Sequence, residues 1–536
     1  DGPPSPGGPS HHFLRAWRRA AGLARRLALW YDAAMNLTGV TRARRAACAG
    51  AALCALANAA TAADRPQWGE RFTRNMVSSE RGLPSSFDPA APTNLLWSAE
   101  LGDETHGSPV IAGGRVFIGT NNGRPRDPRQ TGDRGVLMCF DERTGAFLWQ
   151  LVVPKITTSV YWDWTGCGVC SPPTVEGDRV YAVSSRGEIV CLDINGMADG
   201  NNGPFLDEGR QMVPAGKPPL EPGATDADIL WLYDTIKELG VRQHDAAHAS
   251  ILLDDQFLYV NTSNGVDDTH RHIASPDAPC LIVLDKATGR LVAHDGERIG
   301  PNIFHCTWSS PALTVVNGRK LIIYAGPNGV VYAFEPVTEV KDAVQTLKKV
   351  WWFDIDPGAP KENVHRYTTN RKEGPSTIHA MPVAFGGRVY VSGGGDIWWG
   401  KRESWLFCID ATGSGDVTAT AGRWAYALSR HNLSTPSVWE GLVYVADSGR
   451  KIHCVDAETG TPCWTHDIQG EIWGSTLAAD GKVYVATRRG EFIVLATGRE
   501  KRVLSSTLLD GPVSATPVAA NGTLYLATQR RLYAIR

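Results

Sequence analysis

Short segments rich in β-branched and aromatic residues recur along the chain, and each is bounded by a glycine-containing turn. Examples are Arg179-Val-Tyr-Ala-Val183, Gly441-Leu-Val-Tyr-Val445 and Lys482-Val-Tyr-Val-Ala486. Segments of this length and composition favour β-strands, and the Gly-Asp, Gly-Lys and Asn-Gly pairs beside them favour hairpins. The pattern therefore predicts an all-β chain of closely connected strands.

These strands are grouped in a repeating unit. Each unit opens with a Ser-Pro-like pair, continues through strands separated by glycine turns, and reaches an Asp-x-x-Thr-Gly turn followed by a strand that carries Trp. The two shortest units span roughly 40 residues, which suits a four-stranded propeller blade. The openings lie at Ser108, Ser171, Ser250, Ser310, Met381, Ser434, Ser475 and Thr516. We therefore expect an eight-bladed β-propeller of four-stranded antiparallel blades.

The last unit is one strand short. It runs from Thr516 to Arg536 and contains three strands, while an unused strand is available at residues 94–100. Because sheets stacked around an axis protect most of their edges, we expect the N-terminal strand to close the last blade. Six tryptophans occupy the outer-strand position of their units and are expected to pack between blades: Trp97, Trp149, Trp231, Trp351, Trp424 and Trp464.

The run from Asp141 to Trp149 and the Gly-x-Val-Tyr-Val strands resemble repeats of the pyrroloquinoline-quinone (PQQ) type. Such repeats occur in quinoprotein alcohol dehydrogenases and in the propeller subunit of outer-membrane assembly machinery. The segment Pro66-Gln67-Trp68-Gly69 also resembles secreted bacterial PQQ-like repeat proteins. The resemblance covers about residues 66–536. It implies the propeller fold, but a fold of this kind carries many functions.

The N-terminal residues predict export. From Met35, a basic stretch is followed by an apolar, alanine-rich run over 46–60 and by small residues before Asp64, which is the order found in signal peptides. We therefore expect a non-native extension at 1–34, a signal peptide at 35–63, a lead-in at 64–93 and the propeller at 94–536. The protein is then expected in the periplasm or outside the cell.

Charge and hydropathy limit the partners. The formal net charge is −2 and the pI is about 6.7, which argues against a nucleic-acid partner. No later stretch reaches the length of a transmembrane helix, so an unknown small molecule or an envelope protein is the expected partner.

The cysteines argue against an orthodox PQQ dehydrogenase. Quinoprotein alcohol dehydrogenases carry an adjacent Cys-Cys pair, and this chain has none. The one Cys-x-x-Cys motif, Cys167 to Cys170, is followed by Ser171 rather than by the histidine of a haem c motif. In an exported protein this pair either forms a disulfide or stays free for a metal or redox role. The sequence leaves that choice open.

Histidines recur at one position of the repeat, two residues before the opening pair. His106, His248 and His379 hold this position in blades 1, 3 and 5, whereas blades 4 and 7 carry Trp308 and Trp473. The remaining blades carry Val169, Leu433 and Ser514. Segments that enter the innermost strands lie beside the propeller axis, so these positions are expected to form a ring.

Three imidazoles on such a ring predict a transition-metal site, with copper favoured, because neutral imidazole suits Cu, Zn, Fe or Ni. His305 is a possible fourth group, and His244 and His431 lie near enough in sequence to support the ligands. His305, Trp308 and Trp473 are also candidates for holding a planar cofactor.

The same odd-numbered blades carry long loops at 121–135, at 264–279 with His270 and His272, and at 393–405 with Trp398 and Trp399. These loops are expected to rise over the ring as lids. Two functions remain open. One is a redox or metal-dependent protein with a histidine-lined funnel. The other is a non-catalytic scaffold for envelope proteins or glycans, whose channel histidines bind only water and backbone.

Overall fold

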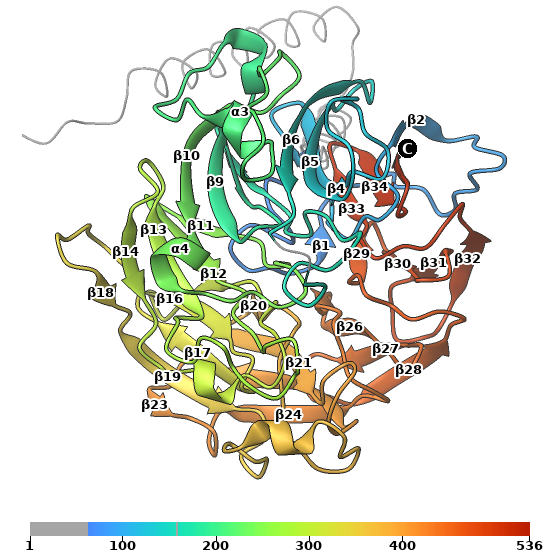
Figure 1. Cartoon of the computed structure of the whole chain (residues 1–536). Helices are drawn as coiled ribbons and strands as arrows, with labels where there is room; N and C mark the ends of the chain where they lie inside the picture. The colour runs from blue at the N-terminus through green and yellow to red at the C-terminus, as the bar shows by residue number, and fades with distance from the viewer. Residues whose placement is uncertain (1–62, 157–158) are drawn as a thin grey trace, which may run out of the picture. The chain divides into compact units, whose positions relative to one another are not determined.

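The computed structural model describes residues 63–156 and 159–536, and this part of the chain forms eight sheets arranged in a ring (Figure 1). In the figure the colour advances around the ring in chain order, so that consecutive blades are neighbours. This confirms the eight-bladed propeller. The expected extension at 1–34 and the signal peptide lie outside the described residues, except for Ala63.

Each blade is an antiparallel sheet whose strands follow one another from the axis outward. Blade 1 contains β3 (Val110–Ala112), β4 (Arg115–Asn121), β5 (Arg134–Asp141) and β6 (Phe147–Pro154), and blade 2 contains β7 (Thr174–Glu176), β8 (Arg179–Val183), β9 (Glu188–Asp193) and β10 (Ile229–Asp234). Blade 3 contains β11 (Leu252–Asp254), β12 (Phe257–Asn261), β13 (Leu281–Asp285) and β14 (Leu291–His294), and blade 4 contains β15 (Ala312–Val316), β16 (Arg319–Ala325), β17 (Val330–Phe334) and β19 (Lys349–Asp354).

Blade 5 contains β20 (Val383–Phe385), β21 (Arg388–Gly394), β22 (Ser404–Asp410) and β24 (Gly422–Ala427), and blade 6 contains β25 (Ser437–Trp439), β26 (Leu442–Asp447), β27 (Lys451–Asp456) and β28 (Pro462–Asp467). Blade 7 contains β29 (Leu477–Ala479), β30 (Lys482–Ala486), β31 (Glu491–Ala496) and β32 (Val503–Leu508), and blade 8 contains β33 (Val518–Ala520), β34 (Thr523–Ala527), β35 (Arg531–Ile535) and β2 (Leu95–Glu100).

Three two-residue strands add to these sheets in parallel: β1 (Val77–Ser78) to β29, β18 (Gln345–Thr346) to β14, and β23 (Gly415–Asp416) to β19. The short helices lie in connections: η1 (Gly196–Asp199), α3 (Glu208–Gln211), α4 (Thr235–Leu239), η2 (Gly300–Asn302) and η3 (Val364–Tyr367). Within the described residues, no helix is long and apolar enough to cross a membrane.

The ring closes as the sequence predicts. Strand β2 pairs antiparallel with β35, and Figure 1 shows this blue N-terminal strand beside the red strands of the last blade. The closure continues at the axis, where the backbone N–H of Thr516 in blade 8 donates to Ser108 Oγ in blade 1 at 2.9 Å. The same hydroxyl contact joins blades 3 and 4, 6 and 7, and 7 and 8. The Ser-Pro-like openings therefore tie neighbouring blades together.

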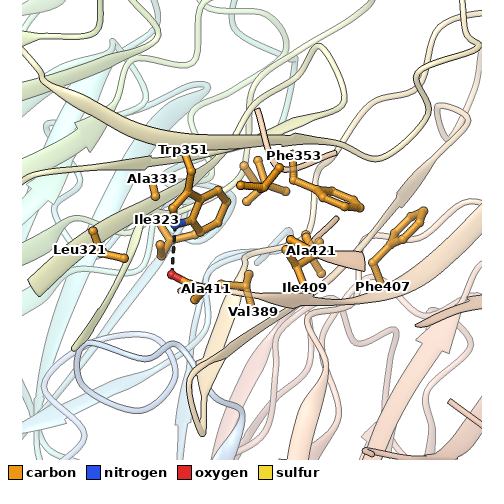
Figure 2. Close-up of a cluster of buried hydrophobic side chains, with 14 of the residues drawn as sticks. Leu321, Ile323, Ala333, Trp351, Phe353, Val389, Phe407, Ile409, Ala411 and Ala421 are labelled. Carbon is orange, nitrogen blue, oxygen red and sulfur yellow. Dashed lines mark hydrogen bonds between the residues drawn. The ribbon is translucent and has the colours of Figure 1, made fainter. Parts of the chain in front are cut away.

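The outer tryptophans explain the other half of the repeat signature. Each of the six donates its indole N–H to a backbone carbonyl of the next blade, at 2.8 to 3.2 Å. Figure 2 shows one of them, Trp351, reaching from blade 4 to the carbonyl of Ala411 in blade 5, within a cluster that includes Ile323, Val389 and Ile409. The predicted packing role is confirmed.

The glycine of the Asp-x-x-Thr-Gly turn makes room for the outer tryptophan of the preceding blade. At Gly145 a Cβ atom would lie 2.5 Å from the Trp97 ring, and the residue has φ of 70°. Gly481 has nearly the same φ, 69°, but faces open space. Comparing alanine substitutions at these two glycines therefore distinguishes the cost of the left-handed backbone from the cost of steric overlap.

We expect Gly481→Ala to cost about 1–2 kcal/mol, because only the left-handed backbone is penalised. Gly145→Ala should cost about 1–3 kcal/mol more, because the methyl group also displaces Trp97. Urea denaturation midpoints of the two variants test this. Equal losses would show that the glycine is required by its φ alone.

The lead-in at 64–93 is bound tightly to the propeller. Residues 65–78 pass around one end of the axis and hydrogen-bond to each of the eight blades, at or beside their innermost strands. The acceptors and donors in the blades are Ile111, Val175, Ser250, Leu313, Ala384, Val438, Ala478 and Ala519. We call residues 65–78 the axial plug.

Candidate metal centre in the axial cavity

A cavity of about 680 Å³ lies at the axis and is lined by the entry segments of all eight blades. Its volume is in the range of sites that enclose small ligands. Trp68 of the axial plug contributes to the lining, and so do Trp398 and Trp399 from the loop between β21 and β22. Tyr161 and Trp164, which precede blade 2, add further aromatic surface.

The predicted ring of equivalent positions surrounds this cavity. Seven of the eight positions line it, and only Val169 does not. The lining positions are His106, His248, Trp308, His379, Leu433, Trp473 and Ser514. Repeat position alone therefore located the cavity.

Two of the ring histidines, His106 and His379, bind carboxylate partners of their own. His106 Nε2 lies 2.9 Å from Glu104 Oε1, and the ring centroids of His106 and His248 are 6.4 Å apart. His379 Nε2 lies 3.0 Å from Asp396 Oδ2. Burial lowers the pKa of His248 to about 3, so this ring is neutral at physiological pH.

A different histidine group converges. Among the described residues, the three imidazoles whose ligand atoms all lie within 4.8 Å of one another are those of His244, His270 and His305, and all three are buried. His244 Nε2 and His270 Nε2 are 3.1 Å apart. We call these three residues the histidine triad.

Hydrogen bonds on the far side of the rings orient the triad. His244 Nδ1 donates to the carbonyl of Val266 at 2.9 Å, and His305 Nδ1 lies 3.1 Å from Asp396 Oδ2. This leaves Nε2 of both rings as the ligand atom, an arrangement usual for metal-binding histidines. His305 Nε2 is buried and has no hydrogen-bond partner.

Asp245 completes the donor set. Its Oδ1 lies 3.5 Å from His244 Nε2 and its Oδ2 lies 4.0 Å from His305 Nε2. Oδ1 is buried without a hydrogen-bond partner. Asp245 and His270 both have left-handed backbones, with φ of 61° and 56°, which is costly for residues with side chains and is often found at functional sites.

Asp396 connects the triad to the lid. Its Oδ2 accepts from His305 and His379, and its Oδ1 accepts from the backbone N–H groups of Trp398 and Trp399. Burial would raise the pKa of Asp396, but the two histidines hold it well below its usual value. Asp396 therefore carries a negative charge that orients His305.

The surroundings of His244 and His270 keep both imidazoles neutral, which is the form that binds a metal. Burial and the neighbouring rings lower the pKa of His244 to about 2, and burial lowers the pKa of His270. For His305, burial lowers the pKa, but Asp396 and Asp245 outweigh it and the pKa is raised. Burial raises the pKa of Asp245 to about 6 despite the nearby His305. A cation among these residues would be balanced by two carboxylates.

Sequence reasoning found part of this site. It proposed His305 as a fourth ligand, placed His244 in a supporting role and assigned His270 to a lid loop, but it did not select Asp245 or Asp396. Asp245 directly follows His244, and Asp396 stands between a glycine run and Trp398-Trp399, so only local context marked them. His272 and His431 are not part of the convergent group.

The other predicted cofactor residues lie in the cavity wall. Trp308 packs against His248 and His379, with ring centroids 4.6 and 5.3 Å apart. Trp473 stacks on His106 at 5.8 Å, and the Arg488 guanidinium lies 4.0 Å from its ring centroid. Cys306 is buried, and its Sγ lies 3.6 Å from His305 Nδ1, on the side of the ring away from Nε2.

Comparison with known proteins gives three kinds of match. The family described as "Outer membrane protein assembly factor BamB" matches residues 83–335, 327–471 and 448–536. The quinohemoprotein alcohol dehydrogenase of Comamonas testosteroni is 26% identical over 146 residues, which is 24% of this chain and 21% of that enzyme. The aligned stretch thus spans about a fifth of the length of that curated relative.

Two solved structures are similar in fold. BamB from Moraxella catarrhalis has a TM-score of 0.48 and 11% identity, and the match covers 82% of this chain and 96% of that one. The Comamonas testosteroni dehydrogenase has a TM-score of 0.43 and 14% identity, with coverage of 89% and 81%.

Proposed function

This chain belongs to the repeat family described as outer membrane protein assembly factor BamB, and we propose that it is a metal-binding member of that family. In this proposal His244, His270 and His305, together with Asp245, hold one transition-metal ion at the wall of the axial cavity. The observation that carries it is the buried, unpartnered His305 Nε2, which faces two further imidazole nitrogens and a carboxylate.

The donor set supports a first-row transition metal. Three imidazoles suit Cu, Zn, Fe or Ni, and Cu(II) is bound most tightly by such ligands, so copper stays the first expectation. The charges of Asp245 and Asp396 would offset those of a divalent ion. When bound, the metal would supply a Lewis acid or a redox centre to a small molecule in the cavity.

The chain's own residues would shape that cavity for a ligand. Trp398, Trp399 and Tyr161 lie against the triad, with Tyr161 and Trp399 at centroid distances of 4.7 and 5.1 Å from His270, and they would limit the access of water to it. Trp308 and Trp473 offer surfaces for a planar ligand. The ring histidines His106, His248 and His379 are the second candidate for the metal, because they line the same cavity.

The family description supports a second candidate function. A propeller related to an outer-membrane assembly factor would act in the cell envelope as a scaffold for protein or glycan partners, without a metal. A PQQ-dependent dehydrogenase is the third candidate. All three candidate functions are compatible with the periplasmic or extracellular location that the signal-like sequence predicts.

Metal content tests the proposal. The protein, purified without a polyhistidine tag, is expected to contain about one transition-metal ion per chain by mass spectrometry, and to regain it after chelation and reconstitution. An absorbance spectrum of the same sample shows whether a quinone is bound. If the folded protein binds neither copper nor zinc after reconstitution, the scaffold function is favoured instead.

A further inference from the structure

A pair of cysteines in the wall of the same cavity has no role in the metal site. Cys167 and Cys170 both line the cavity and are buried, and their Sγ atoms are 3.1 Å apart. Of the cysteines in the described residues, only these two line the cavity. We propose that they form a reversible dithiol–disulfide couple that exchanges two electrons with a small thiol or disulfide in the cavity.

The backbone around the pair is held independently of the sulfur atoms. The Lys155 ammonium donates to the carbonyls of Trp164 and Cys167 and forms an ion pair with Asp163. The N–H of Val169 donates to the carbonyl of Thr120 at 3.1 Å. The loop is therefore held by contacts that do not involve the sulfur atoms, and a disulfide would require the Sγ–Sγ distance to fall from 3.1 Å to about 2.05 Å.

Glycine is required between the cysteines. A Cβ atom on Gly168 would lie 1.9 Å from the carbonyl oxygen of Thr120, so no larger residue fits at this point. The close approach of the loop to blade 1 sets the directions in which both cysteine side chains leave the backbone. The sulfur–sulfur contact is thus imposed by the packing of the loop against β4.

The position of the pair favours exchange over a purely structural crosslink. A disulfide between residues three apart closes a very short loop and stabilises the fold least among possible disulfides. A crosslink that served the core would have no need to face a cavity. These cysteines do line it, as do the charged residues Glu104 and Arg488, so a small molecule in the cavity could reach them.

The exchange is balanced in atoms and electrons. The contact with Cys170 and burial raise the pKa of the Cys167 thiol, so Cys167 keeps its proton in the reduced pair. One thiol, after losing its proton, attacks the small disulfide and releases one thiol from it. The second cysteine then displaces the other half and forms the internal disulfide, so two electrons and two protons pass to the small molecule.

A redox titration of the purified protein tests this proposal. The native protein is equilibrated with mixtures of oxidised and reduced dithiothreitol, and free thiols are then trapped with N-ethylmaleimide. The mass of the tryptic peptide 156–179, which contains both cysteines, is measured by mass spectrometry. We expect the pair to pass from one-tenth to nine-tenths oxidised over an approximately 80-fold change in the reagent ratio. Cys167→Ser and Cys170→Ser should each abolish the transition.

The controls separate this couple from other thiols and from the metal. Cys463→Ser, which removes a partly exposed cysteine, should leave the transition unchanged. A chelator in every sample makes the outcome independent of the metal proposal. The proposal is overturned if the native pair stays reduced with oxidised glutathione. It is also overturned if the disulfide resists dithiothreitol until the protein is unfolded, which would make it structural.

Discussion

Replacing His270 with alanine is expected to abolish metal binding while leaving the propeller folded. His270 lies on the loop between β12 and β13, outside the strand ladders, and its Nε2 faces His244 Nε2 at 3.1 Å. Losing a residue that merely orients a ligand weakens metal binding by roughly 10–100-fold, so the loss of a ligand should exceed about 100-fold. Metal titration of the chelated protein measures the change in dissociation constant.

His248→Ala is the matched control. His248 is a buried imidazole in the same cavity, and its closest ring neighbour is Trp308 rather than a member of the triad. We expect this variant to bind metal as the unmodified protein does. The opposite result, with metal lost from His248→Ala and kept in His270→Ala, would place the metal on the entry ring and refute the triad.

The sequence predicted the fold well because each signal is local and repeated. The Asp-x-x-Thr-Gly turn needs a glycine for its left-handed backbone, and the tryptophan four residues later, as at Trp149 and Trp464, packs against the next blade. A repeat that cannot bury its faces alone implies its neighbours, so counting the openings was enough to predict eight blades. Even the closing strand at 94–100 followed from one missing strand.

The cavity was predictable for the same reason, whereas the metal ligands were not. Entry positions such as His106 and Trp473 recur in register, and the fold brings them to the axis. The triad breaks this periodicity: His244 and His305 precede the entry position by different distances, and His270 comes from a lid loop. Which rings converge depends on irregular backbone, including the left-handed Asp245, that no repeat specifies.

Contacts between residues far apart in the chain could not be predicted from the sequence for a related reason. Asp396 accepts hydrogen bonds from His305, 91 residues away, and from His379. The axial plug similarly joins residues 65–78 to blades that are up to 454 residues distant. Neither contact belongs to the repeat, so each is found only once the ring is assembled.

Replacing Arg74 with methionine is expected to destabilise the whole propeller. This residue of the axial plug is fully buried, and its guanidinium donates to the carbonyls of Pro311, Trp68 and Ser250 at 2.9 to 3.1 Å. Burial lowers the pKa of Arg74 to about 9, so the side chain stays charged at neutral pH. Methionine would fill much of the space but leave the carbonyls of Pro311, Ser250 and Trp68 without this donor, the first two of them in buried residues.

The expected cost is about 3–5 kcal/mol, because charge-assisted hydrogen bonds are lost and buried acceptors are stranded. Urea denaturation followed by tryptophan fluorescence measures it. Arg71→Met is the control in the same segment, since the Arg71 side chain is 52% exposed, forms an ion pair with Glu176 at the surface and lies 4.9 Å from the centroid of the Phe72 ring. It should change stability by less than about 1 kcal/mol. Equal, small losses of unfolding free energy in both variants would mean that the ring of blades is stable without the contacts of the axial plug. A large loss confined to Arg74→Met would instead show that the closure of the eight blades depends on the axial plug.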